Sequence, residues 1–105
     1  MSSVNTSIII LNWNGLEHLK ACLSSVFKQT YNNFEVIFVD NASTDESVNF
    51  VRNNFSRVRI IVNQKNLGFA EGNNVGIRAA LENKEIKYIV TLWRFRCLIS
   101  GWGSL

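Results

Sequence analysis

Asp40 is the acidic residue best placed for ligand recognition, because it directly follows Glu35–Val39 (EVIFV), a short apolar run typical of a buried strand. A carboxylate at such a strand end can accept a hydrogen bond from the N3–H of uracil or thymine, a donor that cytosine lacks. The alternative is that Asp40 only forms an Asx turn. Ser43, Asp45 and Glu46 favour helix capping, with Ser43 as the N-cap residue and Glu46 completing a capping box.

A second polar turn, Asn12-Trp13-Asn14-Gly15, follows the apolar run Ser7–Leu11. Its asparagines can hydrogen-bond to a base or a ribose, and Trp13 can pack on a ring. The alternative is that Asn14-Gly15 is only turn chemistry and Trp13 only caps the core. The turn contains neither the G-x-G-x-x-G dinucleotide fingerprint nor the P-loop pattern, so both of those nucleotide-binding classes are excluded.

A third segment, Asn66–Gly76 (NLGFAEGNNVG), has glycines at four-residue spacing. Gly68 permits a loop conformation that other residues avoid. Gly76 lies in a helical pattern, where glycine costs about 1 kcal/mol relative to alanine. That cost indicates close helix–strand packing or close approach of a ligand. The start of the helix around Gly72–Asn74 is also suited to support an anion.

These segments lie between alternating runs of strand and helix character. Apolar β-branched runs predict strands at Ser7–Leu11, Glu35–Val39, Val58–Val62 and Lys87–Leu92. Apolar residues at helical spacing predict helices at Leu16–Phe27, after the Ser43 capping box (Val48, Val51 and Phe55 inward), and at Gly72–Asn83 (Ile77, Ala80 and Leu81 inward). The order βαβαβαβ predicts an α/β fold with a doubly wound, mostly parallel, Rossmann-like sheet. Ligands of such sheets bind at the carboxyl ends of the strands, where the three polar segments lie.

Composition limits the class of protein further. The 105 residues allow one domain, and 47% hydrophobic with 18% charged residues excludes a disordered chain. Arg94 and Arg96 supply part of the net charge of +3, and the rest of the chain has no basic cluster, which argues against nucleic-acid binding. Met1–Thr6 lacks the features of a signal peptide, and every apolar run is too short for a transmembrane segment. We therefore expect a cytoplasmic protein.

Three sequence segments taken together, SIIILNWNG, FKQTYNNFEVIFVDNASTDES and NLGFAEGNNVGIRAAL, resemble the family 2 glycosyltransferases, particularly the rhamnosyltransferase-like branch. The resemblance runs from about Ser7 to Leu92. It implies the N-terminal half of a GT-A fold, a nucleotide-diphosphate-sugar donor of the UDP or dTDP type, and inverting transfer to a polysaccharide or lipid-linked acceptor, as in cell-wall or polysaccharide biosynthesis. By motif position, the resemblance places Leu11, Asn12, Trp13 and Asp40 in the nucleoside pocket, and Gly68 and Asn74 in the segment that closes the donor site.

The pattern of the family breaks after Leu92. Its members continue with an Asp-rich motif that binds Mg²⁺ or Mn²⁺, whereas no Asp or Glu follows Glu85 here. The acceptor half that carries the catalytic base is also missing. We therefore expect no catalytic or metal-binding residue in this chain and a domain that is inactive alone. The alternative is a non-catalytic nucleotide-binding or interaction module of the same fold.

The last residues differ in composition from the rest. We interpret 1–92 as the nucleotide-sugar-binding part of a GT-A domain, and 93–105 as an aberrant tail produced by a frameshift. The alternative is a genuine ending in which Arg94 and Arg96 replace the metal as phosphate partners. A sheet truncated near Tyr88–Leu92 leaves an edge uncovered, which predicts self-association.

Overall fold

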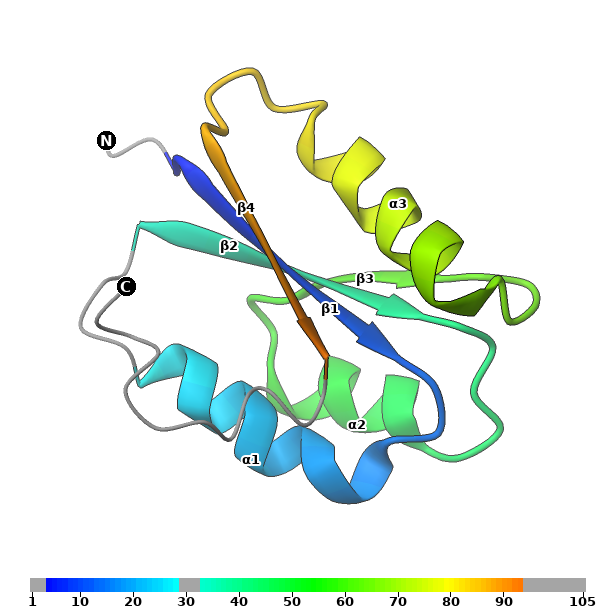
Figure 1. The fold of residues 1–105 in the computed structure, drawn as a ribbon. Helices are drawn as coiled ribbons and strands as arrows, with labels where there is room; N and C mark the ends of the chain where they lie inside the picture. The colour runs from blue at the N-terminus through cyan, green and yellow to red at the C-terminus, as the bar shows by residue number, and fades with distance from the viewer. Residues whose placement is uncertain (1–3, 29–32, 94–105) are drawn as a thin grey trace.

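The computed structural model describes residues 4–28 and 33–93, which form four parallel strands and three helices in strict alternation (Figure 1). The strands are β1 (Thr6–Asn12), β2 (Phe34–Asp40), β3 (Arg59–Val62) and β4 (Tyr88–Trp93). The helices are α1 (Leu16–Phe27), α2 (Ser47–Asn54) and α3 (Gly68–Ala80). The predicted βαβαβαβ order and the parallel α/β sheet are confirmed. Among the described residues, no helix combines the length and the apolar character needed to cross a membrane.

The strand order is β3-β2-β1-β4, so β1 lies inside the sheet between β2 and β4. The register aligns the strand ends: Asn12 of β1 pairs with Asp40 of β2, and Asp40 pairs with Val62 of β3. The chain moves outward from β1 to β3 and then crosses to the opposite side of β1 for β4. All carboxyl ends therefore meet at one edge of the sheet, next to a switch in strand order, where doubly wound folds bind ligands.

Helices cover both faces of the sheet: α1 and α2 lie on one face and α3 lies on the other (Figure 1). Successive side chains of a strand point to opposite faces, so the run of four apolar residues in β1 serves two cores. Ile8 and Ile10 pack with α1 and α2, whereas Ile9 and Leu11 pack with α3. This burial on both sides explains why the strands are apolar throughout rather than alternating.

Two predicted helix starts are wrong. α3 begins at Gly68 instead of Gly72 and ends at Ala80, and Leu81 is exposed rather than inward-facing. The sequence did not indicate the earlier start, because glycine has a low helix propensity. Gly68 has a left-handed φ of 84° at the point where the helix begins. α2 begins at Ser47, so Ser43 is not its N-cap and the predicted capping box does not form.

The strand boundaries differ by single residues. β3 begins at Arg59 instead of Val58, and β4 begins at Tyr88 instead of Lys87. β4 also extends to Trp93, which pairs with Leu11, so the strand includes the first residue of the predicted tail. The remainder of that tail, 94–105, lies outside the described residues.

Close packing of α3 on the sheet explains its internal glycine. A Cβ atom on Gly76 would lie 2.5 Å from Cγ2 of Ile9 and 3.0 Å from Cγ2 of Val39. Both methyl groups belong to fully buried β-branched residues that have little freedom to move. The structure therefore favours helix–strand packing over ligand approach as the reason for glycine at this position.

Candidate functional site

Asn12 and Asp40 form the centre of the polar edge. They are direct register partners, and Nδ2 of Asn12 donates to Oδ1 of Asp40 at 2.9 Å. Both side chains are buried, with 0% and 1% exposure. Oδ1 of Asn12 has no hydrogen-bond partner in the described structure. A buried acceptor without a partner is costly, which marks it as a group that a ligand or water can satisfy.

Ser43 closes the turn around the Asp40 carboxylate. Its backbone N–H donates to Oδ2 of Asp40 and its hydroxyl donates to Oδ1, both at 2.8 Å. The carboxylate thus accepts from the backbone N–H three residues on, whereas an Asx turn joins it to the N–H two residues on. A carboxylate has about four acceptor positions, and the contacts from Asn12 and Ser43 use two on Oδ1 and one on Oδ2. One acceptor position on Oδ2 stays open for a ligand N–H.

Asn14 ties the turn after β1 to the turn after β2. Its backbone N–H donates to Oγ of Ser43 at 2.8 Å, and its Oδ1 accepts from the backbone N–H of Thr44 at 2.8 Å and of Asp45 at 3.3 Å. Its φ of 50° lies in the left-handed region that asparagine tolerates better than most residues. The prediction of turn chemistry at Asn14-Gly15 is thus correct, and the turn also fixes Ser43 against Asp40.

Asp45 caps two helices at once. Its Oδ1 accepts from the backbone N–H of Ser47 at 3.0 Å and also contacts the Ser47 hydroxyl, while its Oδ2 accepts from the backbone N–H of Leu16 at 3.1 Å. Burial by itself raises the pKa of Asp45, but the hydrogen bonds from Ser47 and Leu16 outweigh burial and hold the pKa below its ordinary value. The predicted capping role is correct for Asp45 and wrong for Ser43.

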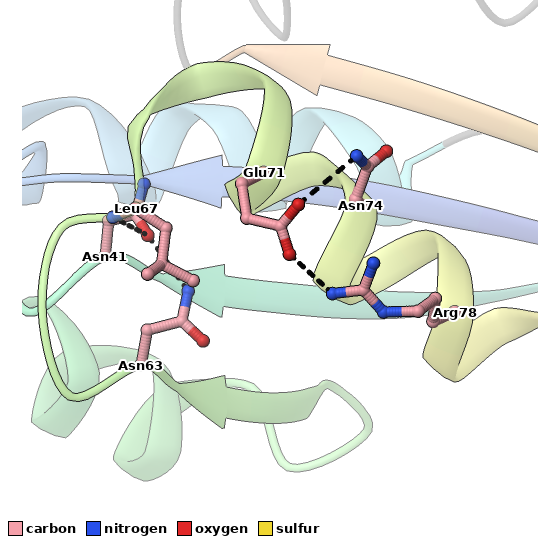
Figure 2. Close-up of polar contacts among 6 residues, drawn as sticks. All are labelled: Asn41, Asn63, Leu67, Glu71, Asn74 and Arg78. Carbon is pink, nitrogen blue, oxygen red and sulfur yellow. Dashed lines mark hydrogen bonds and ion pairs between the residues drawn. The ribbon is translucent and has the colours of Figure 1, made fainter.

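Asn41 connects the third polar segment to this edge. Its Oδ1 accepts from Nδ2 of Asn63 at 2.9 Å and from the backbone N–H of Leu67 at 3.3 Å (Figure 2). Its Nδ2 donates to the carbonyl of Gly68 at 3.1 Å, which brings the start of α3 beside the end of β2. Sequence reasoning missed Asn41. The available signal was its position directly after Asp40, one residue beyond a buried strand.

The other predicted site residues lie in different surroundings. Leu11 is in the core beneath α3, whereas Trp13 is half exposed in the turn after β1. Asn74 is exposed on α3, where its Nδ2 contacts Oε1 of Glu71 at 3.5 Å (Figure 2). Oε2 of Glu71 is 2.6 Å from Nη2 of Arg78, and this hydrogen bond, followed by the contact with Asn74, lowers the pKa of Glu71. The structure therefore joins Asn12, Asp40 and, through Asn41, Gly68.

Comparison with known proteins decides the family. The model of Glycosyl transferase family 2 matches residues 7–92, which is most of the chain. The chain belongs to glycosyl transferase family 2. Among its curated relatives, an uncharacterized glycosyltransferase of Haemophilus influenzae is 41% identical over 75 residues, 70% of this chain and 25% of that protein. The glycosyltransferase GlyG of Streptococcus pneumoniae is 35% identical over 78 residues, 70% of this chain and 26% of that protein.

Solved structures confirm the GT-A fold of this family member. TarS of S. aureus, solved in complex with UDP, has a TM-score of 0.75 at 23% identity and covers 86% of this chain and 27% of its own. The mannosyltransferase PcManGT of Pyrobaculum calidifontis, solved with GDP-Man and Mn²⁺, has a TM-score of 0.67 at 22% identity, covering 75% of this chain and 25% of its own. The chain thus spans about a quarter of the length of these proteins.

The described part of this family member does not fit a divalent cation. It contains no group of three or more His, Cys, Asp or Glu side chains arranged to hold a metal. The two carboxylates at the strand edge, Asp40 and Asp45, already accept hydrogen bonds on both oxygens. A hard cation such as Mg²⁺ or Mn²⁺ needs several free oxygen ligands, so we assign no metal-binding residue.

Proposed function

We propose that residues 1–92 bind the nucleotide part of a UDP or dTDP sugar at the carboxyl ends of β1 and β2. The observation that carries this proposal is the Asn12–Asp40 pair. Oδ2 of Asp40 retains one open acceptor position, and Oδ1 of Asn12 has no hydrogen-bond partner. The donors of Asn12 and Ser43 in the same network are used. Open acceptors at a ligand-binding edge suit the N3–H of uracil or thymine, and cytosine cannot supply that hydrogen bond.

The family context supports this proposal while leaving the base open. TarS was solved with UDP, whereas PcManGT was solved with GDP-Man. The base must therefore be decided by this chain's own side chains. Half-exposed Trp13 offers a ring face beside the same edge. We propose that the rest of the donor extends toward Gly68–Asn74, because Asn41 holds the start of α3 beside the end of β2.

Titration with UDP and CDP tests the choice of base. UDP should bind more tightly than CDP, and Asp40→Ala should remove that preference with a loss of about 1–3 kcal/mol, because a buried donor loses its partner. Asp45→Asn is the matched control: it also removes a carboxylate near the strand ends, but one committed to helix capping. Its preference for UDP should match that of the parent. Equal affinity of the parent for UDP and CDP would refute the proposed role of Asp40.

We further propose that this chain does not transfer sugar alone and gains little nucleotide affinity from Mn²⁺. Two observations support these statements: the chain spans about a quarter of the relatives it matches, and its described residues contain no group of three or more His, Cys, Asp or Glu that could hold a metal. In the same titration, Mn²⁺ should change the affinity for UDP by less than about twofold, an energy well under 1 kcal/mol. A large gain with Mn²⁺ would show that another acid binds the metal. Sugar transfer in a radiolabelled-donor assay would instead show that the chain is a complete enzyme.

The biological setting follows from the same proposal. We propose that the domain is the donor-binding part of an inverting transferase of the rhamnosyltransferase-like branch that acts on a polysaccharide or lipid-linked acceptor, and that it works in the cytoplasm at the inner face of the membrane. One relative, WfgD of Escherichia coli, is named a UDP-Glc:α-D-GlcNAc-diphosphoundecaprenol β-1,3-glucosyltransferase and is 31% identical over 81 residues, 76% of this chain and 32% of WfgD. Cell fractionation tests the location, and recovery of the protein outside the cytoplasmic and inner-membrane fractions would contradict it.

A further inference from the structure

Asn41 is the side chain through which three separate segments meet. It is 3% exposed, and it makes three hydrogen bonds that leave its own strand end. Two of them run from Asn63 and Leu67, in the loop after β3, to its Oδ1 (Figure 2). The third runs from its Nδ2 to the carbonyl of Gly68. The end of β2, the loop and the start of α3 are therefore joined by one amide group.

The sequence of α3 leaves space for this amide. A Cβ atom on Gly72 would lie 2.8 Å from Nδ2 of Asn41 and 2.7 Å from Cδ1 of Leu11. Any larger residue at this position would have to displace the side chains of both Asn41 and Leu11 or tilt the helix. Gly68, at a φ of 84°, has no heavy atom near its would-be Cβ, so its glycine serves the backbone conformation instead. The two glycines thus have different roles, and both favour the contact with Asn41.

We propose that Asn41 is a positioning residue that sets affinity for the diphosphate part of the donor without affecting recognition of the base. This inference rests on the proposed function, in which the base lies against Asp40 and the rest of the donor extends toward Gly68–Asn74. A ligand that touches both halves of a site gains affinity when the halves are held rigidly in register. A ligand that touches only the half at Asp40 gains nothing from that rigidity.

The side-chain hydrogen bonds of Asp40 and Asn41 are separate, which makes the two effects distinguishable. The backbone bonds from Asn63 N–H to the carbonyl of Asp40 and from Asn41 N–H to the carbonyl of Asn12 do not use the Asn41 amide. Asp40 is held by Asn12 and Ser43, and neither of these contacts passes through the Asn41 side chain. Removing the Asn41 amide therefore leaves the base-binding end intact and releases the loop and the start of α3. A purely structural role for Asn41 would instead weaken both halves together.

The test compares uridine with UDP by NMR titration of the parent, Asn41→Ala and Asn63→Ala. Asn41→Ala should weaken UDP about tenfold, as expected for loss of hydrogen bonds worth about 1.4 kcal/mol in total, while uridine affinity changes less than about twofold. Asn63→Ala removes one donor to Asn41 from a half-buried loop residue. It should also weaken UDP more than uridine, but by a smaller factor. It also keeps the test valid if Asn41→Ala does not fold.

The matched control is Asn54→Ala. Asn54 also donates through Nδ2 to a backbone carbonyl, that of Phe50 at 2.8 Å, but on the exposed surface of α2. Its affinities for uridine and UDP should equal those of the parent. Equal losses of uridine and UDP in Asn41→Ala, or no loss of either, would overturn the proposal.

A second measurement separates this inference from the proposed function. Amide hydrogen exchange at Leu67, whose N–H donates to Asn41, should be at least about tenfold faster in Asn41→Ala and unchanged in Asn54→Ala. If the parent bound neither uridine nor UDP, the proposed function would fail and the effect on affinity would fail with it. Unchanged exchange at Leu67 would overturn the positioning role while leaving the proposed function intact.

Discussion

Ser43 shows how one side chain controls what Asp40 can do. The hydroxyl of Ser43 donates to Asp40 and accepts from the backbone N–H of Asn14 and from Nδ2 of Asn12, so its single donor and both acceptor positions are used. The S-x-x-E pattern at Ser43 matches a capping box, yet the hydroxyl is used in the buried network instead. Local pattern and long-range contact compete for the same atom here, and only the structure shows which one prevails.

Ala42 holds an unfavourable backbone conformation between Asn41 and Ser43, with a φ of 62°. A left-handed conformation costs a non-glycine residue about 1–2 kcal/mol, and a β-branched side chain worsens the clash. Ala42→Val should therefore destabilise the fold by about 2 kcal/mol beyond its effect elsewhere, whereas Ala42→Gly should be neutral or stabilising. Urea unfolding measures both.

Ala21→Val, at an exposed site in α1, is the control and should cost well under 1 kcal/mol of unfolding free energy. Equal losses for Ala42→Val and Ala21→Val would contradict the prediction.

At the scale of elements, the strands were predicted better than the helix starts. The strands are short apolar runs bounded by polar residues, so their limits differ from prediction by single residues. α2 begins two residues after Asp45, whose carboxylate is shared with α1, and α3 begins where a side chain from the distant end of β2 supplies a partner. Asp45 fixes the start of α2 while also binding Leu16 of α1, and Asn41 holds the carbonyl of Gly68 at the start of α3. Sequence propensity contains no information on such long-range contacts.

The double cap made by Asp45 predicts a pH-dependent stability. Because its pKa is lowered by folding, the ionised form stabilises the native state above the unfolded pKa, and this contribution disappears as the pH falls through the folded pKa. Asp45→Asn should cost about 1 kcal/mol of unfolding free energy at neutral pH, the usual value of a helix cap. The difference in unfolding free energy between the parent and Asp45→Asn should shrink as the pH falls below 3.8, the ordinary pKa of an aspartate.

Urea unfolding from pH 7 to pH 2.5 measures this difference. Glu46→Gln provides the control, because Glu46 is exposed and its carboxylate accepts from Nδ2 of Asn49 rather than from a backbone N–H at a helix start. Its stability should stay parallel to that of the parent across the whole range. A gap between parent and Asp45→Asn that is independent of pH would contradict the assignment of the ionised carboxylate as the cap.

For the whole molecule, the alternation of strands and helices predicted the fold class, and the strand-end rule predicted that the polar segments containing Asn12 and Asp40 lie at the ligand-binding edge of the sheet. Both follow from general rules: right-handed crossovers leave few arrangements, and parallel strands bring their carboxyl ends to one edge. The details of the site did not follow. Asn41 and Asn14 lie inside the segments that carry the family resemblance, but their partners could not be predicted from those segments. Their contacts depend on a left-handed turn and on glycines that only packing explains. In contrast to the site, the charge and length of the two edge strands can be read directly from their sequences.

The two edges of the described sheet differ in charge and length. β3 has four residues and begins with Arg59, which pairs with Glu82 at 3.5 Å, whereas β4 has six residues and no charge. Tyr88 and Thr91 of β4 are exposed, and no other described strand pairs with its outer side. Long uncharged edges favour pairing with another chain, so we predict self-association through β4 rather than β3.

Sedimentation velocity across a range of concentrations tests this prediction. The parent should form dimers or larger species, and Thr91→Lys should shift the distribution toward monomer, because a lysine on an edge strand opposes pairing with a second strand. Val62→Lys, which places the same charge on an exposed position of β3, should leave the distribution unchanged. A parent that sediments as a single monomeric species with a sharp cooperative melt would show that the β4 edge is not an association surface. A stronger effect of Val62→Lys would assign the association to β3, since each substitution adds charge to only one edge.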